Sequence, residues 1–384
     1  MEPLPPAAPA ANPPSPPSPI LGGSRLRWLV LGVVACALLP LFFSWPATSM
    51  SKQQAAVFNA YWEQIVELKI ANPLFDYRKA FEPGKNEAKR NFRLTVPLLA
   101  RVTGTGITGV TVIRYALQLA LLVALLLAAE RACRDRLIAL AVALAVAGTT
   151  VGTEVWRDLC LWFDNCAHAF MALALVATSP WAAGATVFLA ALTDERALLG
   201  VPLLMVFHLA IGSRRSMQTG MVAGALLYVA VRAVFAQAMG FMPPLTGVAE
   251  HDILATNIAS APLGYWAALE GGWLLVGYAV WRLHATGRTG MALGFAALAL
   301  LPIVASTAVG DFTRSASYGF AATLAALAVV CRPTEAAERP LVRRLAIAAG
   351  VVSLLIPNVN VMRYIAVEQC LPVHAVVQWL DAHP

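Results

Sequence analysis

The chain has 384 residues, of which 59% are hydrophobic and only 13% are charged, and it carries a formal net charge of +7. Soluble globular proteins carry roughly 25% charged residues, so this composition excludes an ordinary soluble enzyme. Much of the basic excess lies in short arginine-bearing loops between apolar runs. Arginine in such loops sets membrane topology, and the net charge therefore does not indicate a nucleic-acid partner.

Residues 1–24 are rich in Pro, Ala and Ser, with prolines clustered from Pro13 to Pro19. Such a segment cannot bury a core, and we expect a disordered cytoplasmic tail. It is too proline-rich, and too poor in basic residues at its start, for a signal peptide. Arg25 and Arg27 directly precede the first apolar run. They predict a cytoplasmic amino terminus and an uncleaved first span.

Long apolar runs recur along the rest of the chain. They are Leu29–Phe43, Tyr115–Ala129, Leu137–Gly148, Ala197–Ile211, Met221–Ala238, Leu263–Trp281, Met291–Val309, Tyr318–Val330 and Leu345–Ile356. With their flanks, most approach the ~20 residues that a helix needs to cross the hydrocarbon core. We therefore predict an all-α, polytopic membrane protein with about 11 transmembrane helices, in which residues 25–384 form a single membrane domain.

One apolar stretch, residues 167–191, is interrupted at Ser179-Pro180-Trp181. A single span here would invert the arginine pattern of every later loop, whereas two short helices joined by a cytoplasmic turn preserve it. Proline at the turn favours two helices. Each arm is short for a full crossing, so the pair is tilted, re-entrant or buried among other helices. This alternation places the carboxyl terminus in the periplasm.

The segment 45–108 follows the first span and is expected on the periplasmic side. Apolar and aromatic residues within Gln53–Ile70 are spaced as in an amphipathic helix lying on the membrane. Phe92–Val102 predicts a second, shorter interfacial helix.

Polar groups gather at the predicted periplasmic ends of several spans. For substrate binding the candidates are Arg157, Asp158, Asp164, His168, Arg196, Asp311 and Arg314. For catalysis the candidates are Glu63, Asp76, Asp194 and Glu195. Arginine grips phosphate with two parallel hydrogen bonds, and a carboxylate deprotonates an acceptor hydroxyl. Ionisable groups near membrane depth are costly and mark sites or pathways.

Each of these motifs also has a structural explanation. Thr193 is a candidate helix N-cap, and Asp194 and Glu195 suit the first turn of the following helix. Asp311 is likewise a candidate cap for the helix that begins near Thr313. A lone histidine such as His168 is more often a hydrogen-bonding group at a helix start than a reactive one.

Cofactor signals are weak. Glu250, His251 and Asp252 are adjacent, but a metal site needs a second group of ligands, so no cofactor is expected. The chain has no phosphate-binding loop and no nucleotide fingerprint, which argues against an ATP-driven pump. Cys160 and Cys166 share a predicted periplasmic loop, where a disulfide is one alternative and free thiols are favoured.

Three motifs together carry a resemblance to a known family. They are Arg93-Leu-Thr-Val-Pro97-Leu-Leu-Ala100, Ala191-Leu-Thr193-Asp194-Glu195-Arg196 and Asp311-Phe-Thr313-Arg314-Ser315. With the long segment after the first span, this pattern resembles the bacterial GT-C-type membrane glycosyltransferases. The resemblance implies a polyprenyl-phosphate-linked sugar donor, an inverting transfer at the non-cytoplasmic face and a catalytic carboxylate in the first periplasmic segment. This chain has no acid there before Glu63, so Glu63 or Asp76 would act as base, or Asp158 or Asp164 would replace them.

The expected function is therefore sugar transfer to a lipid or cell-surface glycan acceptor at the periplasmic face of the bacterial inner membrane, with membrane lipids as neighbours and no nucleic acid. Two alternatives stay open. A transporter or flippase needs ionisable groups through the midplane, for which Glu270 is the main candidate. A non-catalytic membrane subunit of an envelope polysaccharide assembly system is the other.

Overall fold

The computed structural model describes residues 23–43, 52–77, 91–157, 161–238, 251–309, 311–331 and 338–356, with the short pieces 359–361, 365–367 and 379. The proline-rich segment before Gly23, Asp158, Cys160 and Cys370 lie outside the described residues. So do the side chains of Arg157, His251 and Asp252.

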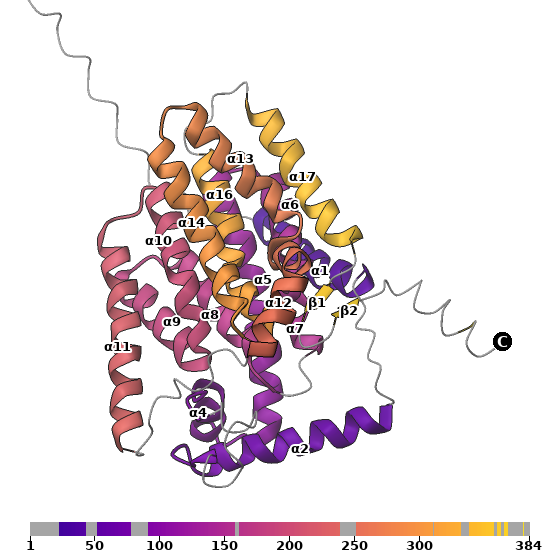
Figure 1. The fold of residues 1–384 in the computed structure, drawn as a ribbon, viewed down its shortest axis with the longest axis vertical. Coiled ribbons are helices and arrows are strands. Elements are labelled where there is room, and N and C mark those ends of the chain that lie inside the picture. Colours follow the sequence, from indigo (N-terminus) through magenta and orange to yellow (C-terminus); the bar gives the residue numbers. More distant parts are fainter. Residues whose placement is uncertain are drawn as a thin grey trace, which may run out of the picture.

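Helices make up nearly all of the described chain (Figure 1). The first half contains α1 (Gly23–Phe43), α2 (Lys52–Ala71), α4 (Thr95–Val102), α5 (Gly106–Cys133), α6 (Arg136–Ala147), α7 (Thr150–Arg157), α8 (Asp164–Val176), α9 (Pro180–Thr193) and the 3-10 helix η2 (Glu195–Gly200). The second half contains α10 (Val201–Ala210), α11 (Ser216–Ala238), α12 (His251–Leu269), α13 (Gly272–Ala285), α14 (Thr289–Ser306), α15 (Phe312–Ala316), the 3-10 helix η4 (Ser317–Phe320), α16 (Ala321–Cys331) and α17 (Arg339–Leu355).

Within the described residues, five helical segments are long and apolar enough to cross a membrane: α1, α5, α11, α14 and the continuous stretch Phe312–Cys331. The pair α6–α7, bent by 58°, adds a sixth if it counts as one broken span. The helical fold with several candidate membrane spans is therefore confirmed. The count of about 11 spans and the GT-C-like arrangement stay predictions.

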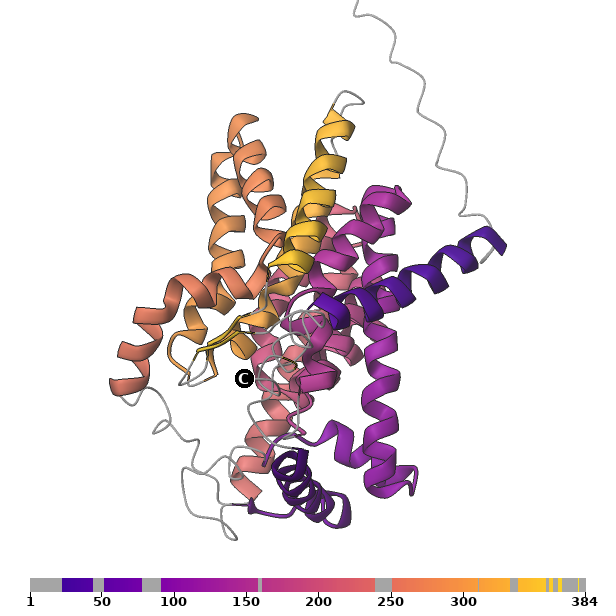
Figure 2. The ribbon, with the colours of Figure 1, turned by 90° about the vertical axis from the view of Figure 1, so that its right-hand side faces the viewer.

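The helices differ in how far they are buried. In the most apolar 18-residue window of Phe312–Cys331, 89% of the residues are buried, whereas only 17% are buried in the corresponding windows of α1 and of α11. Figure 2 shows α1 running obliquely along the outside of the bundle. A helix that is apolar all round and buried all round is a core helix. The interior of this protein is accordingly built around α5, α8 and α16.

The predicted break in residues 167–191 is confirmed. α8 ends at Val176, and α9 begins at Pro180 with Ser179 as its N-cap, whose hydroxyl accepts a hydrogen bond from the Ala182 amide. Proline occupies the first turn of α9, where its missing N–H costs nothing. The two helices are antiparallel neighbours, so the start of α8 and the end of α9 lie at the same end of the bundle.

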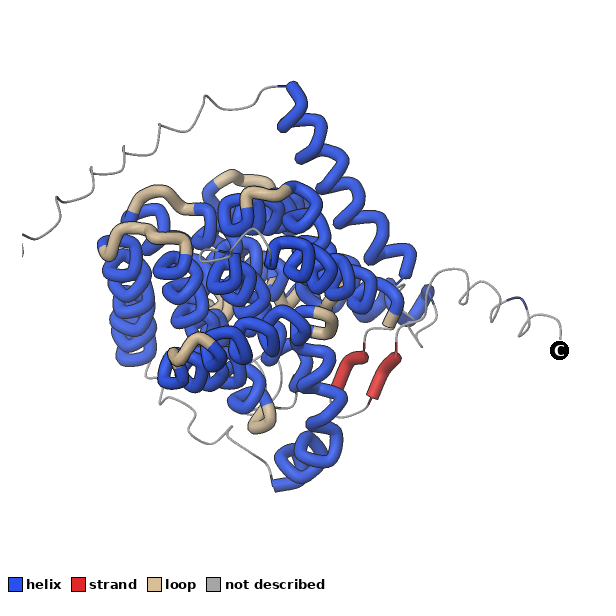
Figure 3. Tube along the Cα trace, turned by 90° about the horizontal axis from the view of Figure 1, so that it is seen from above, coloured by secondary structure: helices blue, strands red, loops and turns tan. Residues whose placement is uncertain are grey.

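One expectation about the second half of the chain is wrong. The apolar run Leu263–Trp281, expected to form one span, is broken between α12 and α13. Glu270 has a left-handed backbone (φ 44°), and a Cβ at Gly271 would lie 2.0 Å from the Ala349 carbonyl oxygen, so this close approach requires glycine. A short antiparallel pair, β1 (Val359–Val361) and β2 (Ile365–Val367), lies at the edge of the bundle (Figure 3).

The segment after the first span contains the two expected helices. α2 covers the predicted range Gln53–Ile70, and α4 falls inside the predicted range Phe92–Val102. In Figure 1, α2 lies across one end of the bundle, close to perpendicular to the long helices. Trp62 and Val66 on its inner face are buried. This arrangement places α2 over the end of the bundle at which α8 begins.

Candidate functional site

Three arginines and two aspartates meet inside the bundle, and we call Arg93, Asp164, Asp194, Arg196 and Arg314 the arginine cluster. Asp164 accepts hydrogen bonds from Arg93 (3.2 Å), Arg196 (3.0 Å) and Arg314 (2.7 Å). Asp194 accepts from Arg196 through Nε (2.9 Å, on Oδ1) and Nη2 (2.6 Å, on Oδ2), and it also pairs with Arg93. Each aspartate is thus shared between arginines from distant parts of the sequence.

Breaks between helices position these side chains. Asp164 is the first residue of α8, directly after Phe163, whose backbone is left-handed (φ 66°). Asp194 connects α9 to η2 in an extended conformation and caps η2, accepting from the Arg196 amide at 3.0 Å. Arg93 precedes α4, and Arg314 lies in the five-residue helix α15. Chain breaks at this level let charged side chains reach the interior without interrupting a long helix.

The cluster is almost completely withdrawn from solvent. Asp164 and Asp194 are 0% exposed, Arg93 is 8% exposed and Arg314 is 7% exposed. Ions buried in this way are strongly destabilising unless each has an opposite charge and hydrogen bonds. Two carboxylates outside the cluster add negative charge next to Arg314. Asp311 pairs with it at 2.8 Å and Glu154 at 3.5 Å.

Aromatic rings cover the guanidinium groups. The Trp162 ring lies 4.9 Å from the Arg93 guanidinium carbon and 5.1 Å from that of Arg314. Tyr318 lies 5.4 Å from that of Arg196. Guanidinium groups stack favourably on such rings. Trp62 of α2 packs on Trp162 at 5.9 Å between ring centroids, so α2 is in contact with the lining of the cluster.

The charges fix the protonation state of Asp194. Burial by itself would raise the pKa of this carboxyl, but Arg196 and Arg93 outweigh burial and hold its pKa well below the usual range. The carboxylates of Asp194 and Asp164 raise the pKa of Arg93 and of Arg196, although burial alone would lower it. Asp194 is therefore a carboxylate at every ordinary pH, which suits it to hold arginines and makes it a weak base.

A second group of side chains continues from the cluster into the bundle. His168 lies one helical turn after Asp164 on α8 and is 0% exposed. Its Nε2 lies 3.0 Å from the Ser317 hydroxyl, which donates to the Arg314 carbonyl at 2.6 Å. Its ring packs 4.6 Å from Tyr318 and 5.7 Å from Phe320, measured between centroids.

The structure brings together five of the seven residues that the sequence suggested for binding and one that it suggested for catalysis. The binding candidates are Asp164, His168, Arg196, Asp311 and Arg314, and the catalytic candidate is Asp194. The other described candidates have different neighbours. Glu195 is 41% exposed and pairs with Arg232 of α11 at 3.4 Å, Glu63 accepts from Asn59 within α2, and Asp76 accepts from Asn91. The Arg157 side chain and Asp158 lie outside the described residues.

Two members of the network were not nominated. Arg93 belongs to a basic stretch that the sequence places at a membrane surface, and Glu154 lies on a helix whose bend at Gly148 was not foreseen. A single arginine directly before an apolar segment, as in Arg93-Leu-Thr-Val, is the signal that indicates the first. The expectation for Thr193 is wrong, because Thr193 ends α9, its hydroxyl donates to Leu189 and Asp194 is the cap. Asp311 occupies the N-cap position of α15 without a capping bond and pairs with Arg314 instead.

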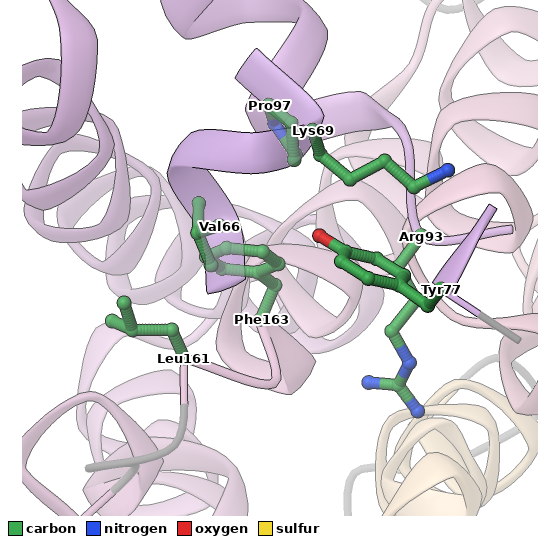
Figure 4. Close-up of a pocket in the computed structure, with 7 residues that line it drawn as sticks. All are labelled: Val66, Lys69, Tyr77, Arg93, Pro97, Leu161 and Phe163. Carbon is green, nitrogen blue, oxygen red and sulfur yellow. The ribbon is translucent and has the colours of Figure 1, made fainter. Parts of the chain in front are cut away.

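A small cavity adjoins Arg93 between α2, α4 and the segment before α8 (Figure 4). Its lining residues are Val66, Lys69, Tyr77, Arg93, Pro97, Leu161 and Phe163. Lys69 is 1% exposed and donates to the carbonyls of Pro73 (3.1 Å) and Phe75 (2.6 Å). Burial lowers the pKa of this amine to about 8, although Asp76 opposes the shift. The cavity is thus largely apolar, with two cations at its edges.

Among the described residues, no group of three or more His, Cys, Asp or Glu side chains is arranged to hold a metal ion. The described cysteines Cys36, Cys133, Cys166 and Cys331 are free thiols.

Comparison with known protein families, with curated proteins and with solved structures found no match to this chain.

Proposed function

We propose that this chain is a membrane glycosyltransferase that moves a sugar from a polyprenyl-phosphate donor to a lipid or glycan acceptor. The observation that supports the proposal is the arginine cluster. Three guanidinium groups from separate segments converge on one point, held in place by Asp164 and Asp194. Arginine is the residue best suited to grip a phosphate through paired hydrogen bonds.

The donor phosphate would reach the cluster from the side of Asp311. The Asp311 side chain is 35% exposed, and the Arg196 side chain is 16% exposed, the largest value among the three arginines. Exchange of the Arg314–Asp311 pair for an Arg314–phosphate pair keeps the buried guanidinium neutralised. Asp164 and Asp194 stay in place during this exchange, and the arginines are already oriented when the donor arrives.

The proposed reaction is a displacement at the anomeric carbon of the sugar that inverts its configuration. The acceptor hydroxyl gives its proton to a carboxylate as its oxygen attacks the anomeric carbon of the sugar. The bond from that carbon to the phosphate oxygen breaks, and the polyprenyl phosphate leaves with the bonding electrons. Arg196 and Arg314 would stabilise the charge that develops on the phosphate. Asp311, released from Arg314, is the most accessible base of the network, whereas Asp194 is too strongly held by two arginines.

The helices α2 and α4 would shelter the lipid carrier. α2 touches the cluster through the Trp62–Trp162 contact, and Arg101 of α4 donates to the carbonyl of Ile70 in α2, so the two helices are connected. In this proposal the cluster faces the periplasm of a bacterial inner membrane and the amino terminus is cytoplasmic.

A non-catalytic membrane subunit is the second candidate. One specific observation favours it, because Asp164 and Asp194 are 0% exposed and every arginine of the cluster already has a carboxylate partner. A network in which every arginine charge is already paired without a ligand can serve to fix the packing of the helices.

Turnover of lipid-linked sugar tests the proposal directly. Purified protein in nanodiscs is offered a panel of polyprenyl-phosphate sugars with a membrane lipid extract, and donor consumption is measured. Arg314→Ala is expected to abolish transfer while leaving insertion intact, and Arg314→Lys should lose roughly 100-fold or more because lysine cannot form the paired contact. Arg343→Ala, at an exposed ion pair (2.6 Å) elsewhere, is the matched control.

Folding of each variant is checked by its thermal unfolding transition. Full turnover in a folded Arg314→Ala protein would remove the arginine cluster from the reaction. Saturable donor binding without turnover in the wild type would favour the non-catalytic subunit.

A further inference from the structure

Two buried polar atoms next to the arginine cluster have no hydrogen-bond partner anywhere in the described chain. They are Nδ1 of His168 and the hydroxyl of Tyr318. Both residues are 0% exposed, and their rings are neighbours, 4.6 Å apart. Buried polar atoms are nearly always satisfied, so such a pair calls for an explanation.

The hydrogen bonds around Ser317 determine which nitrogen of His168 carries a proton. The Arg314 carbonyl can only accept, so the Ser317 hydroxyl donates to it at 2.6 Å. Ser317 Oγ must therefore accept from His168, and Nε2 of His168, 3.0 Å away, is the protonated nitrogen. A second proton on Nδ1 would place an unpaired cation beside guanidinium groups in the interior, which is strongly unfavourable. Nδ1 is accordingly a bare acceptor.

The two unsatisfied atoms are complementary. Nδ1 of His168 needs a donor, and the Tyr318 hydroxyl is a donor without an acceptor. A hydroxyl group satisfies both at once, because it donates one hydrogen and accepts another. The Arg196 guanidinium stacks on the Tyr318 ring, 5.4 Å from its centroid.

We infer that His168 and Tyr318 together bind one hydroxyl group, supplied by an interior water molecule or by an alcohol. This inference stands on the two unsatisfied atoms and does not require the transferase reaction. A bound water would complete the polar network of the core, as buried waters commonly do. A bound alcohol would identify the place where a hydroxyl-bearing substrate enters.

His208 provides a matched comparison within the same protein. It is also 0% exposed, but both of its nitrogens have partners: Nδ1 lies 2.9 Å from the Ser213 hydroxyl, and Nε2 lies 2.9 Å from the Ala174 carbonyl. The two histidines share residue type and burial and differ in one unsatisfied nitrogen.

Solid-state NMR of protein labelled with ¹⁵N-histidine in liposomes tests the inference. Spectra of His168→Gln and His208→Gln proteins assign the two sets of resonances. Nδ1 of His168 is expected to carry no attached proton and to show the shift of a hydrogen-bonded acceptor. Transfer of magnetisation from water to this nitrogen, absent at His208, would identify water as the source.

The alcohol is tested by adding geraniol or methyl glucoside to the same sample. A shift of Nδ1 of His168 on addition, without water transfer beforehand, would identify an alcohol as the source. Tyr318→Phe, which removes the donor to the bound hydroxyl, should weaken or abolish both the water transfer and the alcohol-induced shift at Nδ1 of His168. A shift typical of a free lone pair under all conditions, or a proton on Nδ1, would overturn the inference. Because the readout is a hydrogen bond and not turnover, this outcome would leave the transferase proposal untouched.

Discussion

Ion pairs are built differently at the two ends of α8. At its start, Asp164 is shared by three arginines and is fully buried. Near its end, where Arg131 of α5 donates to the Ala177 carbonyl, the ion pairs are more exposed, and Glu130 is shared by only two arginines, Arg25 and Arg136. Arg343 and Asp135 there are 52% and 25% exposed, and Arg25 and Glu130 are 38% and 16% exposed.

This difference separates two uses of charge. An exposed pair contributes about 0–1 kcal/mol and is easily replaced. A buried network costs several kcal/mol of desolvation per ion, so it persists only where it specifies packing or serves a reaction. The network also reaches the depth of Arg114, whose carbonyl accepts from Asn165 beside Asp164. Arg114 lies eight residues, or about 12 Å, into α5 from Gly106.

Removal of the charge on Asp164 should cause the largest loss of stability. Asp164→Asn leaves three buried arginines with one shared carboxylate fewer, and we expect a loss of about 3–5 kcal/mol in the free energy of unfolding. Asp135→Asn, at the exposed pair, should lose less than about 1 kcal/mol. Denaturant titration of both variants in the same detergent provides the measurement. Equal losses of unfolding free energy in the two variants would mean that burial does not make the ion pairs at the start of α8 more important for stability than those near its end.

Lys69 tests an intermediate case, a buried cation held by carbonyls. Its pKa falls from 10.5 to about 8 in the folded protein, chiefly through burial. Between these values the unfolded chain binds more protons than the folded chain, so stability should rise with pH in that window, by on the order of 2 kcal/mol. The measurement is the free energy of unfolding at pH 8 and pH 10.5, in the wild type and in Lys69→Met. The variant should lack this rise, and parallel curves for the two proteins would contradict the shifted pKa.

The helical membrane fold could be predicted from the sequence because apolar runs of this length and number are stable only when they are withdrawn from water. The break between α8 and α9 could be located because Ser179 and Pro180 favour the N-cap and the first turn of a helix. The sequence also nominated Asp164, Asp194, Arg196 and Arg314, since charges between apolar runs are conspicuous. Local patterns do not determine which charges meet. Arg93 and Asp164 are 71 residues apart, and Arg314 and Asp164 are 150 apart. Their pairing depends on how α4, α8 and α15 pack, which no short motif encodes.

The smallest effect is expected at the exposed pair Asp135–Arg343, where the ionic contribution can be measured separately from helix capping. Asp135 accepts from the amides of Leu137 and Ile138 as the N-cap of α6, and an asparagine side chain at this position would keep the capping function. A double-mutant cycle of Asp135→Asn with Arg343→Gln should therefore report a coupling of about 0.2–1 kcal/mol that declines at high salt.

Arg343 and the two amides lower the pKa of Asp135 against the opposing effect of burial. The folded chain then holds fewer protons than the unfolded chain as pH falls, so this contribution is complete at neutral pH and is lost in acid. A coupling of several kcal/mol that resists salt would show that solvent exposure does not weaken this pair, and the contrast with the buried cluster would need another cause.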